Sequence, residues 1–295
     1  MSFLFVDRIL EFVPGKMCRG LKYVTQDDIY LCQDKNNKLC FSPSMIGEAL
    51  GQLAAWNAMF SVDFKYRPVA GIVDAAQLIR NVYIGDTILL EANIESVDET
   101  AIQYNAKAMV RGEEVFNIRN ALGPMMPMQD FIDEDLILKQ FKEINRYGDW
   151  VGDLGNSSKD EIISAKTSPQ IVSLTYDKII EQKSGIRIIA QKKISRQAPF
   201  FPDHFPNNPV LPLTVLLECN IDLAHRFIKK SNFAHDFYLS EIRKIKINEF
   251  VHPGDEIVTS ILVKQHEENI LILRFRTEVL GKRVCVLEIV MTRDV

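Results

Sequence analysis

The sequence is short of several features that mark particular classes of protein. It has five cysteines, an odd number without a CxxC spacing, which argues against both a disulfide framework and a zinc site. Lys and Arg total 35 against 39 Asp and Glu, so a nucleic-acid binder that relies on bulk positive charge is not expected. No apolar run approaches the roughly 18 residues of a membrane helix, and the N-terminus lacks the basic segment of a signal peptide. We therefore expect a soluble cytoplasmic protein with reduced cysteines.

What the sequence does contain is an internal repeat. Its 295 residues suit two domains of about 100–150 residues each. Three segments of the first half recur in the same order in the second half, 169 or 170 residues later. They are Val6–Glu11 with Tyr176–Glu181, Ser44–Leu50 with Thr214–Asn220, and Ile84–Asp86 with Pro253–Asp255. We infer a unit duplicated at residues 1–123 and 171–295, joined by a linker of residues 124–170. The linker is expected to contain a helix over Asp133–Tyr147 and a loop over Gly148–Lys159.

Each half shows the same order of predicted elements. The segments 44–60 and 214–228 are predicted helices, and the first is apolar on nearly every face, which indicates a buried helix. Runs of alternating or β-branched residues follow each helix. They are Thr87–Glu95, Ile102–Val110, Val115–Leu122, Ile257–Lys264, Asn269–Val279 and Arg283–Thr292. A buried helix followed by an antiparallel sheet long enough to wrap it is the hot-dog pattern. We predict an α+β double hot-dog, with two tandem units forming a pseudo-dimer.

The sharpest local signal is the segment 199–218, PFFPDHFPNNPVLPLTVLLE. Its prolines prevent a helix and favour a rigid extended loop. His204 lies inside this loop between aromatic residues, shortly before a predicted buried helix that carries Glu218. The alternative is an ordinary loop histidine without a chemical role.

Glu48 stands inside the first apolar helix. An ionised carboxylate there costs several kcal/mol unless it is paired or protonated. Two interpretations remain open: a carboxylate held by solvent or a structural hydrogen bond, and a general acid whose pKa is raised by burial.

These segments resemble the β-hydroxyacyl-acyl-carrier-protein dehydratases of the FabA/FabZ type. The histidine loop is similar to that family's F-F-x-G-H-F-P-x-x-P-V-M-P-G-V-L-x-x-E, with Glu218 14 residues after His204. The segments FLFVDRILEFVPGK, EALGQLAAW and Pro253-Gly254-Asp255 resemble three further family motifs. The resemblance implies a hot-dog dimer in which each site takes the histidine of one subunit and the carboxylate of the other.

A fused chain then has two potential sites, which the repeat distinguishes. All five histidines lie in the second half, and the position matching His204 is Asp34. The family's glutamine one turn after the acid is present as Gln52 in the first half and replaced by Asp222 in the second. We predict one complete site, His204 with Glu48 supported by Gln52, and a degenerate second site, Asp34 with Glu218.

The predicted chemistry uses neutral His204 as a base for the carbon next to a thioester carbonyl and Glu48 as the acid for the leaving hydroxyl. Helix N-termini offer donors to the developing oxyanion. Where the family has glycine, this chain has Pro43 and Leu213, so Ser44 or Leu213 is expected to donate. Asp203 next to the base is expected to raise the pKa of His204.

The predicted function is dehydration of 3-hydroxyacyl thioesters to trans-2-enoyl thioesters in fatty-acid, polyunsaturated-lipid or polyketide synthesis. The expected substrate tunnel is lined by Phe200, Phe201, Phe205, Pro209 and Val210. No cofactor or metal is expected, since the substrate travels on the phosphopantetheine of a carrier protein or on coenzyme A. The expected partner is acyl carrier protein, docking on Arg243, Lys244 and Lys246, although an exposed charge cluster on a strand is the alternative for these three residues.

Two rival functions remain open. A hot-dog acyl thioesterase hydrolyses the same thioesters, and a degenerate hot-dog subunit binds acyl chains or carrier protein without turnover. The chain is expected to be a monomeric pseudo-dimer or a dimer of it.

Overall fold

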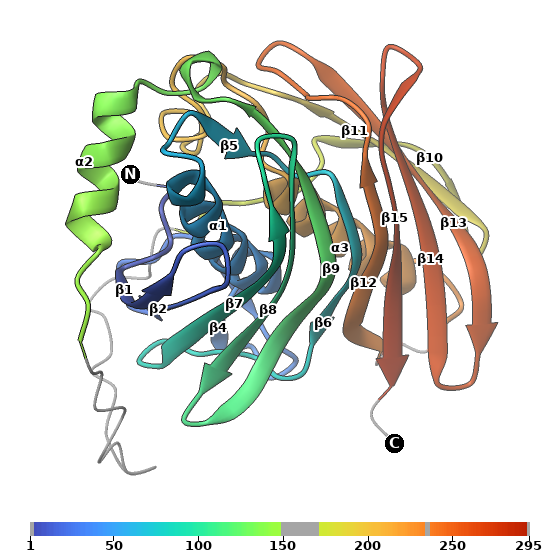
Figure 1. Ribbon diagram of the computed structural model, residues 1–295. Helices are drawn as coiled ribbons and strands as arrows, with labels where there is room; N and C mark the ends of the chain where they lie inside the picture. The colour runs from blue at the N-terminus through green and yellow to red at the C-terminus, as the bar shows by residue number, and fades with distance from the viewer. Residues whose placement is uncertain (1–2, 149–170, 234–236, 294–295) are drawn as a thin grey trace.

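One antiparallel sheet of thirteen strands runs through both halves of the protein in the computed structural model, which describes residues 3–148, 171–233 and 237–293 (Figure 1). The spatial order is β1-β2-β7-β8-β9-β6-β12-β15-β14-β13-β11-β10, with β5 paired to β9 beside this path. The first six strands belong to the first half of the chain and the last six to the second. The same sequence of elements therefore appears twice, related by an approximate two-fold axis between β6 and β12.

The first half contains the helix α1 and nine strands within the described residues. Their bounds are β1 Arg8–Val13, β2 Met17–Tyr23, β3 Leu31–Gln33, β4 Leu39–Phe41, α1 Pro43–Ser61, β5 Tyr66–Pro68, β6 Ile72–Leu78, β7 Thr87–Val97, β8 Ala101–Val110 and β9 Glu113–Pro127. β3 and β4 form a small separate hairpin. The short helix η1 (Met128–Asp130) and the helix α2 (Glu134–Ile144) follow.

The second half repeats this plan with fewer elements. Its bounds are β10 Lys178–Lys183, β11 Arg187–Lys193, α3 Leu213–Lys229, β12 Phe237–Ile247, β13 Glu256–Glu267, β14 Ile270–Val279 and β15 Lys282–Arg293. The proline-rich segment before α3 forms no strand, so it takes the place that the β3–β4 hairpin occupies in the first half. The predicted helices and the six predicted strands are present, and the predicted double hot-dog fold is confirmed.

The two halves join edge to edge through β6 and β12, which run side by side at the centre of Figure 1. The pairing is antiparallel and extends from Gln77 opposite Glu241 to Ile72 opposite Lys246. The sequence analysis predicted neither strand. The joint makes one continuous sheet that curves around both α1 and α3 (Figure 1).

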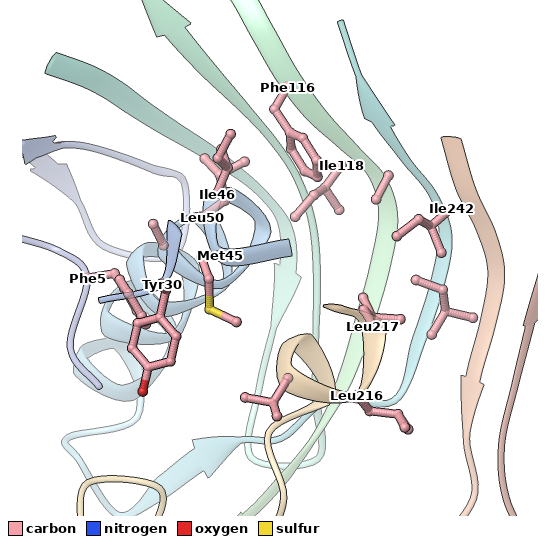
Figure 2. Close-up of a cluster of buried hydrophobic side chains, with 14 of the residues drawn as sticks. Phe5, Tyr30, Met45, Ile46, Leu50, Phe116, Ile118, Leu216, Leu217 and Ile242 are labelled. Carbon is pink, nitrogen blue, oxygen red and sulfur yellow. The ribbon is translucent and has the colours of Figure 1, made fainter. Parts of the chain in front are cut away.

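The buried face of the sheet and the two helices form a shared core. In α1, the side chains of Met45, Leu50 and Leu53 are fully buried, as its apolar composition predicts. Figure 2 shows side chains of the first half, such as Phe116, packed in one cluster with Leu216 and Leu217 of α3. Because α1 also packs directly against α3, neither half has a core of its own.

Helix α2 lies at the left of Figure 1, at the outer end of the first half. Its Phe141 packs against Trp56 and Phe60, with ring centroids 5.8 and 5.6 Å away. This helix lies within the segment for which the sequence analysis expected one. The loop expected over Gly148–Lys159 lies outside the described residues from position 149 onward.

The hairpins that join β8 to β9 and β14 to β15 turn at glycines. Gly112 and Gly281 adopt φ angles of +80° and +77°, a region in which a Cβ atom is strained.

Over the described ranges, the structure has no helix with the length and apolar character needed to cross a membrane.

Because the core is shared, removing side-chain volume from α1 is expected to destabilise both halves together. We expect Leu50→Ala to lower the free energy of unfolding by about 2–5 kcal/mol, with one cooperative transition in urea followed by circular dichroism. Leu280→Ala is the matched control, because Leu280 is 97 % exposed. Two separate transitions, of which only one shifts in Leu50→Ala, would contradict a shared core.

Candidate active site

Glu48 lies on α1 and its carboxylate is fixed by two side chains. Gln52, one helical turn later, donates from Nε2 to Oε1 over 2.9 Å. Thr214, in the first turn of α3, donates from Oγ1 to Oε2 over 2.6 Å. Burial raises the pKa of Glu48, and the hydrogen bonds from Thr214 and Gln52 and the charge of Arg67 oppose the shift only in part. The proton is therefore held more tightly than on an exposed glutamate.

Gln52 is itself held in one orientation. Its Nε2 also donates to the carbonyl of Phe3 over 3.0 Å, and its Oε1 accepts from the amide of Phe5 over 2.8 Å. Both ends of the side-chain amide are thus engaged, which leaves no freedom to flip. The N-terminal segment before β1 therefore orients Gln52, and Gln52 in turn orients Glu48.

His204 is held by its own loop. Its Nδ1 lies 3.0 Å from the carbonyl of Val210, and because a carbonyl can only accept, the neutral imidazole carries its proton on Nδ1. This leaves the Nε2 lone pair available to accept a proton. The ring stacks on Phe205, with centroids 4.1 Å apart, and meets the edge of Phe3 at 5.8 Å.

The electrostatic surroundings keep His204 neutral. Burial, reinforced by the charge of Arg67, lowers its pKa to about 4, although the Val210 carbonyl opposes the shift. The expectation that Asp203 raises this pKa is wrong, because burial dominates and lowers it. The Oδ2 atom of Asp203 instead accepts the amide of Phe3 over 2.7 Å.

His204 and Glu48 line the same cavity, which has a volume of about 240 Å³. The histidine comes from the second half of the chain and the glutamate from the first. Apolar side chains of both halves complete the walls, including Phe116 and Ile118 of β9 and Ile242, Ile245 and Ile247 of β12. The cavity therefore lies where the two halves meet and offers a base, a carboxyl group and an apolar lining together.

The pseudo-symmetric position holds a second buried carboxylate without a base. Ser44, in the first turn of α1, donates from Oγ to Oε2 of Glu218 over 2.5 Å. This contact is the pseudo-two-fold equivalent of the one between Thr214 and Glu48. Burial raises the pKa of Glu218. The glutamine position is Asp222, which accepts from Thr175 over 2.5 Å and from Arg226 over 2.7 Å.

Asp34 does not meet Glu218 in the described structure. It lies in the turn between β3 and β4, where its Oδ1 accepts the amides of Asn36 and Lys38 over 2.8 Å each. Its Oδ2 accepts from the hydroxyl of Tyr83 over 3.0 Å. The hydrogen bonds, that of the Lys38 amide first, lower the pKa of Asp34. Its carboxylate therefore stabilises a turn.

Comparisons with known proteins identify the family of this chain. A 3-hydroxyacyl-[acyl-carrier-protein] dehydratase FabZ from Oenococcus oeni is 32 % identical over 114 residues, which cover 38 % of this chain and 82 % of that protein. The chain belongs to the FabZ-type dehydratase family. The sequence profile of the ApeI-like family, described as ApeI dehydratase, matches residues 180–286. The predicted FabA/FabZ-type resemblance is confirmed.

Solved structures show the fold over nearly the whole chain. A Lactobacillus plantarum protein assigned as an oleoyl thioesterase superposes with a TM-score of 0.58 at 10 % identity, covering 95 % of this chain and 99 % of that one. A MaoC-like dehydratase does so with a TM-score of 0.53 at 11 % identity, covering 96 % and 98 %. At these identities the likeness establishes the double hot-dog arrangement and nothing about the reaction.

The tunnel residues predicted for this FabZ-type chain divide into two groups. Phe205 and Val210 line the cavity. Phe200 and Phe201 do not: they pack on each other with centroids 4.6 Å apart and are 4 % and 0 % exposed in the core. Pro209 also lies off the cavity, and its carbonyl contacts Nδ1 of His252 at 3.0 Å. Because the loop folds back on itself, only its second part faces the site.

The two predicted oxyanion donors, Leu213 and Ser44, differ in their hydrogen bonding. Leu213 is the first residue of α3 and lines the cavity, and an amide at this position has no partner within the helix. Ser44 lines the cavity too, but its hydroxyl is committed to Glu218. The helix end that faces His204 and Glu48 is that of α3.

The three predicted docking residues lie on β12. Arg243 and Lys244 point to Glu288, at 3.2 and 3.6 Å, and Lys264 and Arg274 reach the same carboxylate. Burial alone would raise the pKa of Glu288, but these cations outweigh it and hold the pKa at about 2. Lys246 is exposed, and its neighbours Ile245 and Ile247 line the cavity, so it lies on the opposite face of the strand.

Five polar residues that line the cavity were not identified from the sequence. They are Arg67 on β5, Tyr104 on β8, Gln140 on α2, Thr214 on α3 and Glu249 shortly after β12. Tyr104 is an unremarkable polar position in an alternating strand, and Arg67 belongs to a short strand with no counterpart in the second half. The repeat, which revealed the other site residues, carried no signal for either.

The neutral state of His204 can be observed directly. We expect its ring signals in NMR to titrate near pH 4, whereas an exposed histidine titrates near 6.5. Since the unfolded chain takes up this proton at a higher pH than the folded one, the contribution of His204 to stability is present above about pH 6.5 and is lost as the pH falls toward 4. His204→Gln is expected to reduce that loss. Titration of His204 near 6.5 would contradict the buried environment.

Proposed function

We propose that the protein removes water from 3-hydroxyacyl thioesters bound to acyl carrier protein and releases trans-2-enoyl thioesters. The observation that carries the proposal is the placement of His204 and Glu48, one from each half, on a single apolar cavity. The family relationship supports it, because the named FabZ relative is a 3-hydroxyacyl-[acyl-carrier-protein] dehydratase.

The reaction begins with removal of a proton from the carbon next to the thioester carbonyl. Nε2 of His204 accepts this proton, and the electron pair of the C–H bond moves onto the thioester, whose oxygen gains negative charge. The amide of Leu213, at the positive end of the α3 dipole, is placed to donate to that oxygen. The Val210 carbonyl stabilises the imidazolium that forms, since it already accepts from Nδ1.

The second step expels the hydroxyl group. The electron pair returns to form the carbon–carbon double bond as the bond from the β-carbon to oxygen breaks. Glu48 gives its proton to the departing oxygen, so that water leaves. Burial supports this role because it raises the pKa of Glu48, while Thr214 and Gln52 hold the carboxyl group in one position.

We propose one active site per chain. Glu218 accepts a hydrogen bond from Ser44, just as Glu48 accepts one from Thr214. The residue that matches His204 in the first half is Asp34, whose carboxylate is hydrogen-bonded within its own turn. No cofactor takes part in the proposed steps, and the substrate is carried on phosphopantetheine or coenzyme A. A single chain already supplies both halves of the site.

For docking of the carrier protein we propose the outer face of β12. Arg243, Lys244, Lys264 and Arg274 surround the single carboxylate of Glu288. Four cations against one anion leave a local positive charge, although the chain as a whole carries −4. Such a patch attracts an acidic partner.

The central test compares three single variants on a 3-hydroxyoctanoyl thioester of acyl carrier protein. We expect His204→Ala and Glu48→Gln each to lower kcat by about 10²–10⁴, measured by the ultraviolet absorbance of the enoyl thioester. Glu218→Gln is the matched control and is expected to retain wild-type turnover. Loss of activity in Glu218→Gln with full activity in Glu48→Gln would reverse the assignment.

The same assay separates the rival functions. Release of free thiol without an enoyl product would identify a thioesterase. Binding of the acyl thioester with neither product would identify a non-catalytic subunit.

The docking proposal predicts an effect that depends on the carrier. We expect Lys246→Glu and Lys244→Glu to raise KM for the carrier-protein thioester about ten-fold, roughly 1.4 kcal/mol, while KM for the N-acetylcysteamine thioester stays unchanged. Lys282→Glu is the control, because Lys282 is an exposed residue at the start of β15. Equal KM values in all three variants would place the docking surface elsewhere.

A further inference from the structure

Arg67 brings a positive charge into the cavity that the proposed reaction has not used. It lies on β5, which pairs with β9 at residues 125–127. Its side chain lines the cavity together with His204 and Glu48. The guanidinium carbon lies 3.6 Å from the ring centroid of Phe205 and 5.8 Å from that of Phe131.

Aromatic faces, not carboxylates, hold this cation. Within the described part of the chain, Arg67 forms no ion pair, and its Nε is buried without a hydrogen-bond partner. Contact with ring faces orients a guanidinium without neutralising it. Burial lowers the pKa of Arg67 to about 9, opposed by the charge of Glu48, so the group stays protonated at neutral pH.

Among the described residues, no other group of the cavity forms an ion pair with this cation. His204 is neutral above its lowered pKa, and the raised pKa of Glu48 favours a neutral acid. Two carboxylates, Asp203 and Glu249, also line the cavity, but neither forms an ion pair with Arg67. Asp203 accepts the amide of Phe3, and Glu249 is exposed to solvent. Tyr104 is uncharged because burial raises its pKa.

The position relative to the base is defined by Phe205. The His204 ring stacks on Phe205 at an interplanar angle of 24°, and the guanidinium lies over the same ring. Two groups this close cannot share one ring face, so Phe205 is placed between the cation and the base. Arg67 therefore lies across Phe205 from His204, and its charge acts over this distance to lower the pKa values of both His204 and Glu48.

We propose that Arg67 is a catalytic residue whose guanidinium stabilises the negative oxygen formed on the thioester when His204 removes the neighbouring proton. The inference rests on the proposed function and adds a residue to it. When the C–H electron pair moves toward the carbonyl, the oxygen changes from neutral to anionic, and Arg67 supplies the balancing charge beside the Leu213 amide. In the next step the electron pair forms the double bond, the hydroxyl leaves with the proton of Glu48, and the oxygen becomes neutral again.

The effect on rate follows from where the charge acts. A fixed cation in a buried site favours an anionic transition state more than the neutral substrate. In Arg67→Met we expect kcat to fall by about 10², while KM changes by less than about three-fold. In Arg67→Lys, which keeps the charge, we expect kcat to recover in part. Arg119→Met is the control, since Arg119 is exposed and pairs with Glu241 on the outer face.

A binding experiment tests the same charge without turnover. Octanoate carries a carboxylate where the enolate oxygen would form, and octanamide is its neutral counterpart. By calorimetry at pH 7, we expect the wild-type protein to bind octanoate about ten-fold more tightly than octanamide. Arg67→Met and Arg67→Gln are expected to bind the two ligands equally, with circular dichroism and thermal unfolding confirming that the variants are folded.

The outcomes separate this inference from the proposed function. Equal affinity of the wild-type protein for both ligands, or a preference for octanoate that persists in both neutral variants, would overturn the role of Arg67. Wild-type kcat in folded Arg67→Met would overturn it as well. A preference for octanoate that depends on Arg67, in a protein that forms no enoyl product, would reject dehydration while retaining the anion site.

Discussion

Two crossed hydrogen bonds between the central helices are the constraint on which the rest of the structure depends. Thr214 at the start of α3 donates to Glu48 in α1, and Ser44 at the start of α1 donates to Glu218 in α3. Each buried carboxyl group thus obtains its partner from the opposite half, which is why the halves cannot separate without leaving two polar groups unsatisfied. The shared apolar core and the β6–β12 joint hold the helices at the separation that these contacts require.

The duplication allows the two equivalent positions of the fold to carry different residues. In a symmetric dimer both sites use the same residues, so a substitution alters both. In this chain the copies vary independently: the first half has a turn closed by Asp34 where the second half has the loop of His204. The crossed contact is present at both positions, which indicates that it stabilises the fold whether or not a histidine lies beside it.

The sequence predicted much of this arrangement because a repeat carries spatial information. The constant offset of 170 between Glu48 and Glu218 placed both carboxyl groups on equivalent helices, and the unequal histidines indicated which crossed pair to examine. The structure brings His204 and Glu48 to one cavity. Phe200 and Phe201, by contrast, were expected at the cavity from their aromatic character alone. Their direction depends on how the proline loop folds back, which no local pattern encodes.

Other features depend on tertiary structure and had no signal in the sequence. Arg67 reaches the cavity because β5 pairs with the end of β9, a contact made across the chain. The pKa of His204 was expected to rise because Asp203 is adjacent in sequence, but burial decides the direction and is a property of the folded protein. Two of the three basic residues of β12, Arg243 and Lys244, proved to pair with Glu288, 45 and 44 residues later in the chain.

The central claim is that each chain contains one site built from both halves. It is tested most directly by the stoichiometry with which the wild-type protein binds a 3-hydroxyoctanoyl pantetheine amide, a stable analogue of the thioester, in a calorimetric titration. The account predicts one equivalent bound per chain. Two equivalents of equal affinity would show that the position of Glu218 is also a working site and would contradict it.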